Sequence, residues 1–182
     1  MILRIAAAIA ILLVAVCYRE TFRIWFRADD FAWLGLAGSE NLFDVFFKPA
    51  AQGTVRVLSE RLFFFGLGRM FGIESAIPFR ILILSTVIGN AVLLAAIAYR
   101  LTASRLSALL SMAVWILHPG VSMAVCWISS YNQLLVTSCM LSAMLAFLSD
   151  RKLLCWIAFL AGFGALEING SCRAYRRRRV RD

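Results

Sequence analysis

The stretch ILILSTVIGNAVLLAAIAY, from Ile81 to Tyr99, decides the fold class of this 182-residue chain. It holds nineteen residues without a charged side chain, and Arg80 and Arg100 stand directly before and after it. A helix needs about 20 predominantly apolar residues to cross the hydrocarbon core of a bilayer. The stretch therefore predicts a transmembrane helix with a basic residue at each end.

The composition of the whole chain agrees with this prediction. Apolar residues make up 62% and charged residues 16% of the sequence, against about 45–50% and about 25% in average soluble domains. A soluble domain of this size keeps a large surface and cannot bury so many apolar side chains. A soluble enzyme, a disordered chain and a disulfide scaffold are excluded, which leaves an all-α, polytopic integral membrane protein.

Further apolar runs predict about five transmembrane helices in total. The additional runs are Met1–Tyr18, Leu106–Leu117, Leu134–Leu148 and Leu153–Leu166. The first run has two interpretations, a signal peptide or an uncleaved span, and the bulky residues before any cleavage position favour the uncleaved span. His118-Pro119-Gly120 directly follows the second run and is a typical helix stop.

Basic residues beside the spans predict the orientation. They lie at three places: Arg4, Arg100 with Arg105, and Arg151 with Lys152. Cytoplasmic loops carry an excess of Lys and Arg, and all three places are cytoplasmic if five helices alternate from a cytoplasmic N-terminus. Residues 19–80 then form a large first outer loop and 118–133 a short second one. The chain is expected in the cell inner membrane as a multi-pass protein.

The large outer loop is predicted to contain amphipathic helices. Arg19, Arg23 and Arg27 recur every four residues, which indicates either an extension of the first helix or a short interfacial helix. Val55–Gly72 is apolar, but four charged residues interrupt it, so it is expected to lie against the membrane rather than span it. The pair Asp29-Asp30 lies between these two segments and has two interpretations, a functional carboxylate pair or a solvated helix end.

The last fourteen residues, 169–182, differ from the rest and are expected to be a disordered basic tail. Arg173–Asp182 holds six arginines and one aspartate. Five spans would place this tail outside, against the positive-inside rule. It is interpreted either as the product of a frameshift or as an anchor for anionic lipid. No nucleic-acid recognition motif accompanies the arginines, so nucleic-acid binding is not expected in spite of the net charge of +9.

The sequence lacks the residue patterns expected of a metal site or of a transporter. The five cysteines and one histidine lack metal-ligand spacing, so no metal site is expected. A transporter is expected to carry buried charge or broken helices near the membrane midplane. Between Ile81 and Leu148 the spans hold no charged residue well inside, and Asn90 is the one strongly polar side chain there. This pattern disfavours transport.

A series of short motifs carries a family resemblance over about residues 1–168. In chain order they are D-D-F at Asp29, an arginine before an apolar helix at Arg56, F-G-x5-P-F-R from Phe71, R-L-T-x-S-R from Arg100, H-P at His118 and A-V-C-W-I-S-S from Ala124. Their order resembles that of bacterial membrane glycosyltransferases of the GT-C superfamily, relatives of the polyprenyl- and dolichyl-phosphate-sugar protein O-mannosyltransferases. The family core has more spans than five, so the chain resembles its N-terminal portion.

The resemblance implies a function. Such enzymes move a sugar from a polyprenyl-phosphate donor to an acceptor at the outer membrane face, with an acidic motif in the first outer loop as catalytic carboxylate. It implies Asp29 and Asp30 as catalytic residues, and Arg56 and His118 as substrate-binding residues. His118 is equally interpreted as a helix-end histidine. No cofactor is implied, a divalent metal is left open, and the partners are the lipid-linked sugar and membrane lipids. The alternative is a non-catalytic membrane subunit or an inactive truncated protein.

Overall fold

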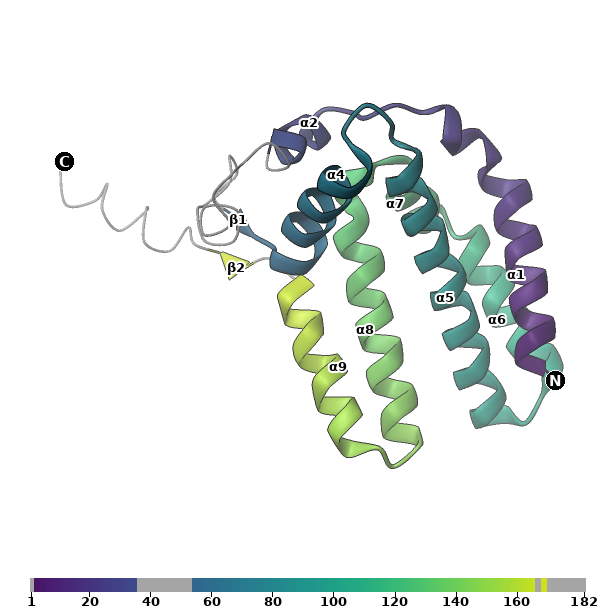
Figure 1. Ribbon diagram of the computed structural model, residues 1–182. Coiled ribbons are helices and arrows are strands. Elements are labelled where there is room, and N and C mark those ends of the chain that lie inside the picture. The colour runs from purple at the N-terminus through teal and green to yellow at the C-terminus, as the bar shows by residue number, and fades with distance from the viewer. Residues whose placement is uncertain (1, 36–53, 166–167, 170–182) are drawn as a thin grey trace, which may run out of the picture.

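The computed structural model describes residues 2–35, 54–165 and 168–169, and these form a bundle of helices that lie side by side (Figure 1). The long elements are α1 (Ile2–Tyr18), α5 (Ile77–Thr102), α6 (Arg105–Leu117), α8 (Tyr131–Leu148) and α9 (Lys152–Ala165). The predicted tail beyond Asn169 and the outer-loop residues 36–53 lie outside the described residues.

Shorter elements gather at the upper end of the bundle in Figure 1. They are the 3-10 helices η1 (Arg19–Arg23) and η4 (Ile128–Ser130), the π-helix η3 (Val57–Phe65), and the α-helices α2 (Asp29–Leu34), α4 (Gly66–Phe71) and α7 (Pro119–Cys126). The two-residue strands β1 (Thr54–Val55) and β2 (Ile168–Asn169) pair antiparallel. Apart from this pair, the described elements are helical, so the all-α prediction is confirmed.

Three of the described helices are long and apolar enough to cross a membrane: Leu3–Arg23, Ile77–Thr102 and Ile128–Leu148. Helices α6 and α7 pass the same test together as one span bent by 49°. The fifth predicted span corresponds to α9, whose 14 residues reach about 21 Å at 1.5 Å per residue, less than the roughly 30 Å of hydrocarbon. The described helices thus give three or four spans of full length.

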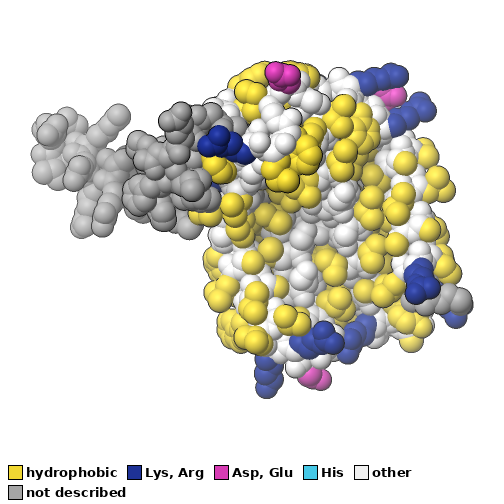
Figure 2. Space-filling view, viewed as in Figure 1, with side chains coloured by type: hydrophobic (Ala, Val, Ile, Leu, Met, Phe, Trp, Pro, Cys, Tyr) yellow, Lys and Arg dark blue, Asp and Glu magenta, His cyan; other side chains and the backbone are white. Residues whose placement is uncertain are grey.

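The lower end of the bundle brings the three predicted groups of basic residues together. The N-terminus, the α5–α6 turn and the α8–α9 turn all lie there (Figure 1), and Lys and Arg side chains line the lower edge in Figure 2. We call this the basic end. Both turns are tight, because Ala103 and Asp150 adopt positive φ values of 53° and 55°, a conformation that commonly ends a helix.

The break between α6 and α7 follows from His118-Pro119-Gly120, as the sequence predicts. Pro119 has no N–H to continue the helix, and the Gly120 N–H donates instead to His118 Nδ1 at 3.1 Å. The Ile116 carbonyl therefore lacks its helical partner. The Tyr18 hydroxyl, from the end of α1, donates to this carbonyl at 2.6 Å.

The segment predicted as a second outer loop, residues 118–133, is instead largely helical. It forms α7, η4 and the first turn of α8. The reason is its apolar content: Val121, Ala124, Val125 and Ile128 are all buried in the core. Because these side chains recur at helical spacing, the segment forms short helices that pack on the bundle.

Two kinds of apolar contact help to hold the bundle together. Small residues on α1, spaced four apart, let that helix pack closely: Ala6, Ala10 and Val14 are buried, and α1 lies against α5 and α6. At the upper end, aromatic rings pack edge to face, with Phe79 in contact with Phe26 and Phe63. Apolar side chains that stay exposed cover much of the flank in Figure 2, as expected for a lipid-facing surface.

A polar contact joins α5 to α8 within their apolar stretches. Asn90 is fully buried, its Nδ2 donates to the Leu134 carbonyl at 3.0 Å, and its Oδ1 accepts from Ser138 Oγ at 2.6 Å. The side-chain amide of Asn90, the strongly polar residue of the predicted spans, thus hydrogen-bonds α5 to α8.

We expect the Asn90–Ser138 pair to show a measurable coupling energy. In a double-mutant cycle with Asn90→Ala and Ser138→Ala, the loss of unfolding free energy in mixed micelles should be non-additive by about 0.6 kcal/mol, and at most about 1.7 kcal/mol. Asn90→Ala with Ser142→Ala, one turn further along α8, is the matched control and should be additive. Additive behaviour of the first pair would contradict the interaction.

Candidate functional site

A polar cavity of about 190 Å³ lies at the upper end, and we call it the site cavity. Its walls come from three parts of the chain that are distant in sequence: α2, η3 with the preceding Arg56, and η4 with the start of α8. The lining residues are Asp29, Trp33, Arg56, Glu60, Trp127, Ser129, Ser130, Asn132 and Gln133. Two of the four predicted site residues, Asp29 and Arg56, are therefore brought together.

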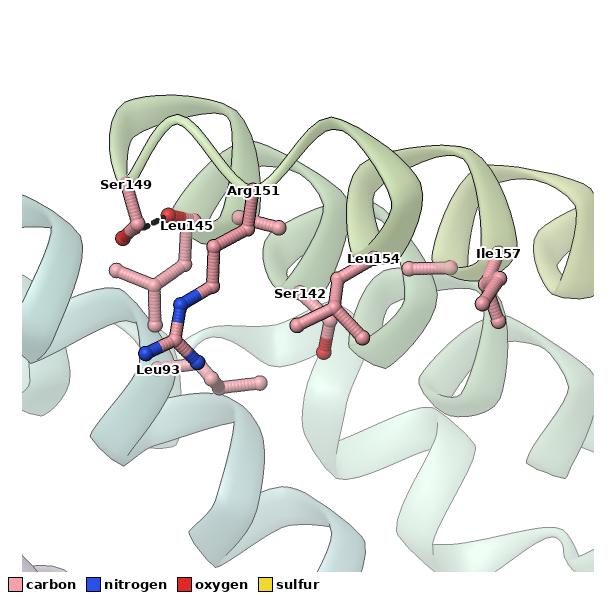
Figure 3. A pocket seen from close by; sticks show the side chains of 9 residues that line it. Leu93, Ser142, Leu145, Ser149, Arg151, Leu154 and Ile157 are labelled. Carbon is pink, nitrogen blue, oxygen red and sulfur yellow. Dashed lines mark hydrogen bonds between the residues drawn. The ribbon is translucent and has the colours of Figure 1, made fainter.

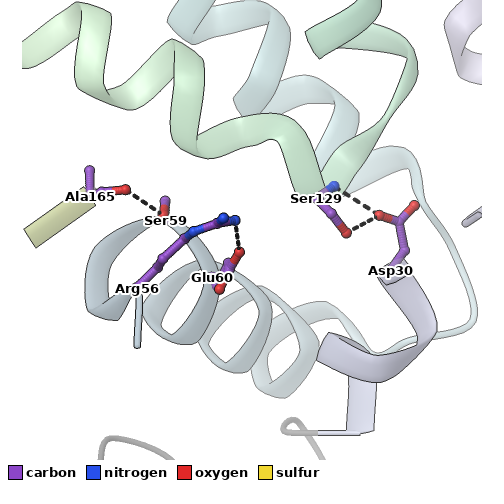
Figure 4. A network of polar contacts seen from close by, with 6 residues as sticks. All are labelled: Asp30, Arg56, Ser59, Glu60, Ser129 and Ala165. Carbon is purple, nitrogen blue, oxygen red and sulfur yellow. Dashed lines mark hydrogen bonds and ion pairs between the residues drawn. The ribbon is translucent and has the colours of Figure 1, made fainter. Parts of the chain in front are cut away.

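Asp30 does not line the site cavity but lies buried behind it. Its Oδ1 accepts hydrogen bonds from the Ser129 backbone N–H at 2.8 Å and from Ser129 Oγ at 2.5 Å. Its Oδ2 accepts from the Arg27 backbone N–H at 2.8 Å. The side chain has no exposed surface. Asp30 thus joins α2 to η4, as Figure 4 shows, and its oxygens are already engaged.

Asp29 has the opposite environment, although it is the neighbouring residue. Adjacent side chains on a helix diverge by about 100°, and at the start of α2 this turns Asp29 toward the site cavity while Asp30 faces the core. Asp29 is half-buried. Of the two carboxylates, Asp29 is the one that a ligand in the cavity can reach.

Arg56 and Glu60 form an ion pair across one turn of η3. The Arg56 Nη1 contacts Glu60 Oε1, and the two side chains are 17% and 0% exposed. Figure 4 shows this pair on the side of η3 that faces η4. Arg61 follows Glu60 directly in η3. Burial lowers the pKa of the Arg61 guanidinium, and the nearby Glu60 carboxylate offsets part of this effect by raising the pKa. The predicted amphipathic segment Val55–Gly72 therefore buries part of its charge against the protein.

His118 lies in a neighbouring cavity and not in the site cavity. This second cavity, of about 200 Å³, is lined by His118 together with residues of α6, α7 and α8, and it shares Gln133 with the site cavity. The His118 side chain is exposed and caps α7 by accepting the Gly120 N–H. This placement agrees with the interpretation as a helix-end histidine.

Arg80 is a buried charge at the same end of the bundle. Its Nη1 donates to the Val125 carbonyl at 2.5 Å, and its Nη2 lies 3.4 Å and 3.5 Å from the Ile24 and Trp25 carbonyls. In a continuous helix the Val125 carbonyl would accept from the Ser129 N–H, which instead donates to Asp30. Arg80 and Asp30 therefore satisfy one carbonyl and one N–H that the break between α7 and η4 leaves open.

Sequence reasoning did not name several cavity residues. Glu60 carried a signal, because it follows Arg56 by four residues and helical neighbours at that spacing meet. Trp33 carried the same signal, because it follows Asp29 by four residues on α2. Trp127, Asn132 and Gln133 carried none, because only the packing of η4 against α2 brings them to Asp29.

Among the described residues, no group of three or more His, Cys, Asp or Glu side chains is arranged to hold a metal ion. No protein-family model, curated protein or solved structure matches the chain.

The two carboxylates should respond differently to substitution. Asp30→Asn places an amide where the buried carboxylate accepts three hydrogen bonds, and hydrogen bonds to charged groups contribute about 1.5–3 kcal/mol. We expect a loss of about 2–3 kcal/mol of unfolding free energy in mixed micelles. Asp29→Asn, the matched control, should cost less than about 1 kcal/mol. Equal losses would contradict the assignment of Asp30 as the structural residue.

Proposed function

We propose that the chain is a membrane glycosyltransferase of the GT-C kind, or the N-terminal portion of one. It transfers a sugar from a polyprenyl-phosphate donor to an acceptor at the outer face of the cell inner membrane. The observation that carries this proposal is the meeting of Asp29 and Arg56 in one polar cavity at the end of the bundle opposite the basic end.

The positions of the basic turns support the proposal that this chemistry takes place at the outer face. If the basic end is cytoplasmic, as the positive-inside rule indicates, the N-terminus is cytoplasmic and the site cavity opens near the outer surface. The phosphate of a polyprenyl-linked sugar lies at that depth, with its apolar chain in the bilayer. The apolar flank of the bundle is suited to contact that chain.

The chemistry assigns Asp29 the role of general base. The Asp29 carboxylate accepts the proton of the acceptor hydroxyl, whose oxygen forms a bond to the anomeric carbon of the sugar. The bond between that carbon and the phosphate oxygen breaks, and the lipid phosphate leaves with the electron pair. A base must lie within hydrogen-bond reach of the proton it removes, and the position of Asp29 in the cavity wall supports this role.

The other cavity residues bind and orient the donor. The Arg56 guanidinium has the shape to hold phosphate through two hydrogen bonds, and its ion pair with the buried Glu60 fixes its position. Trp33 and Trp127 offer flat apolar faces for the sugar ring, and Asn132 offers amide hydrogen bonds. At about 190 Å³ the cavity is smaller than the roughly 300–1,000 Å³ of drug-sized ligand sites, which suits a sugar or a headgroup.

The second candidate is a non-catalytic membrane subunit, including an inactive truncated protein. The Arg56–Glu60 ion pair favours it, because Arg56 already has an anionic partner within the chain. In that case the site cavity is part of the packing at the upper end, and Asp29 is a solvated helix-end residue.

We expect Asp29→Asn to lower sugar transfer by a factor of about 10²–10⁴, the usual contribution of a general base. The assay measures transfer from a panel of polyprenyl-phosphate hexoses and pentoses in membranes, at matched protein levels. Glu74→Gln, an exposed acid outside the cavity, is the control and should keep the wild-type rate. Near-normal transfer by Asp29→Asn refutes the catalytic assignment, and a wild-type chain that transfers none of these sugars supports the non-catalytic subunit.

We expect opposite labelling of the two ends of the bundle. In a cysteine-free background, Glu74→Cys at the upper end should react with a membrane-impermeant maleimide in intact cells. Thr102→Cys at the basic end should react only after lysis. Both positions are exposed in the structure, so access to reagent depends on the side of the membrane. The reverse pattern would invert the proposed orientation.

A further inference from the structure

A second pocket, of about 380 Å³, lies near the basic end and plays no part in the proposed glycosyl transfer. It opens between α5, α8 and α9, and we call it the basic-end groove. Apolar side chains form most of its walls, with two hydroxyls and one guanidinium among them: Leu93, Ser142, Leu145, Ala146, Ser149, Arg151, Leu154, Ile157 and Ala158.

Two of the three polar groups of this groove, Ser149 and Arg151, lie at one end of it. Figure 3 shows Arg151 extending from the α8–α9 turn toward Leu93 on α5, with Ser149 beside it and Leu154 and Ile157 further along the groove. From Ser149 to Ser142 is two turns of α8, or about 10 Å. The groove therefore runs from a charged mouth at the basic end to an interior about 10 Å deeper, where Ser142 lies among apolar side chains.

The charges around the mouth are mainly positive. Arg100 donates to Ser149 Oγ at 2.7 Å, and Arg151 and Lys152 follow directly in the chain. Asp150, exposed in the same turn, is the acid at this place. Three cations against one anion leave an excess of two positive charges at the opening of an apolar groove.

We propose that the basic-end groove binds one anionic phospholipid from the leaflet that the basic end faces. The phosphate lies at Arg151, within the field of Arg100 and Lys152, and an acyl chain fills the interior between Leu93, Leu145 and Ile157. Basic pockets between membrane helices are suited to anionic headgroups. A free anion would leave the apolar interior unfilled, and an apolar helix would leave the cationic mouth without a counter-charge. This inference does not depend on the glycosyltransferase proposal.

Native mass spectrometry of the full chain in detergent tests the proposal. The probes are dioleoylphosphatidylglycerol, dioleoylphosphatidylcholine with the same acyl chains, and inorganic phosphate. The wild type should retain one phosphatidylglycerol about fivefold more tightly than phosphatidylcholine, since one basic residue near a membrane surface contributes about that factor. Inorganic phosphate should not displace the lipid.

Three variants locate the binding. Arg151→Gln should reduce the affinity for phosphatidylglycerol to that for phosphatidylcholine. Ala158→Phe, which fills the groove, should weaken both lipids. Arg105→Gln is the matched control, because it removes the same charge at the same end but does not line the groove, and it should bind as the wild type does. Circular dichroism and yield confirm that each variant is folded.

Several results would overturn the proposal. Equal binding of the two lipids, or an equal loss in Arg105→Gln and Arg151→Gln, would reduce the effect to the general charge of the basic end. Displacement by inorganic phosphate would identify a simple anion site. Self-association that Ala158→Phe abolishes, with lipid binding unchanged, would identify a second copy of the chain as the occupant.

Discussion

The upper end of the molecule depends on how the break between α7 and η4 satisfies its backbone. Breaking a helix leaves N–H and carbonyl groups without helical partners, and burying such groups unpaired is costly. Here the Ser129 N–H donates to the Asp30 carboxylate, and the Val125 carbonyl accepts from the Arg80 guanidinium. Two buried side chains of opposite charge thus take the place of one helical hydrogen bond, and they fix α2 and α5 to the break.

This arrangement gives the neighbouring carboxylates of Asp29 and Asp30 different environments. Because Asp30 is engaged in the core, the helical turn that starts at Asp29 must direct Asp29 toward the site cavity. The same break turns η4 and the start of α8 so that Ser130 and Gln133 reach that cavity. The proposed base therefore has its position set by a residue that never touches the substrate, and the site cavity and the packing of the upper end have a common origin.

The sequence predicted the elements whose cause is local. The uncharged run Ile81–Tyr99, the stop at His118-Pro119-Gly120 and the basic turn at Arg151 each depend on a few neighbouring residues, and the structure has a helix, a helix end and a turn there. The sequence did not predict the features that depend on contacts between residues far apart in the chain. Arg80 was expected as a residue flanking a span, yet it is buried, because its acceptors come from Val125 and Ile24. Likewise, the sequence did not show which of Asp29 and Asp30 is the buried residue, and only the contact of Asp30 with Ser129 separates the two.

The buried guanidinium of Arg80 also sets an order on biogenesis. Its acceptors at Ile24 and Trp25 are synthesised before α5, whereas Val125 follows 45 residues later. When α5 first enters the bilayer, the bonding shell of this cation is incomplete, so water and headgroups must solvate it. Once α7 packs against α5, the Val125 carbonyl can replace water as a hydrogen-bond acceptor for Arg80. Docking of the broken helix therefore completes the bonding of Arg80, and a nascent chain stalled before Val125 would lack that acceptor.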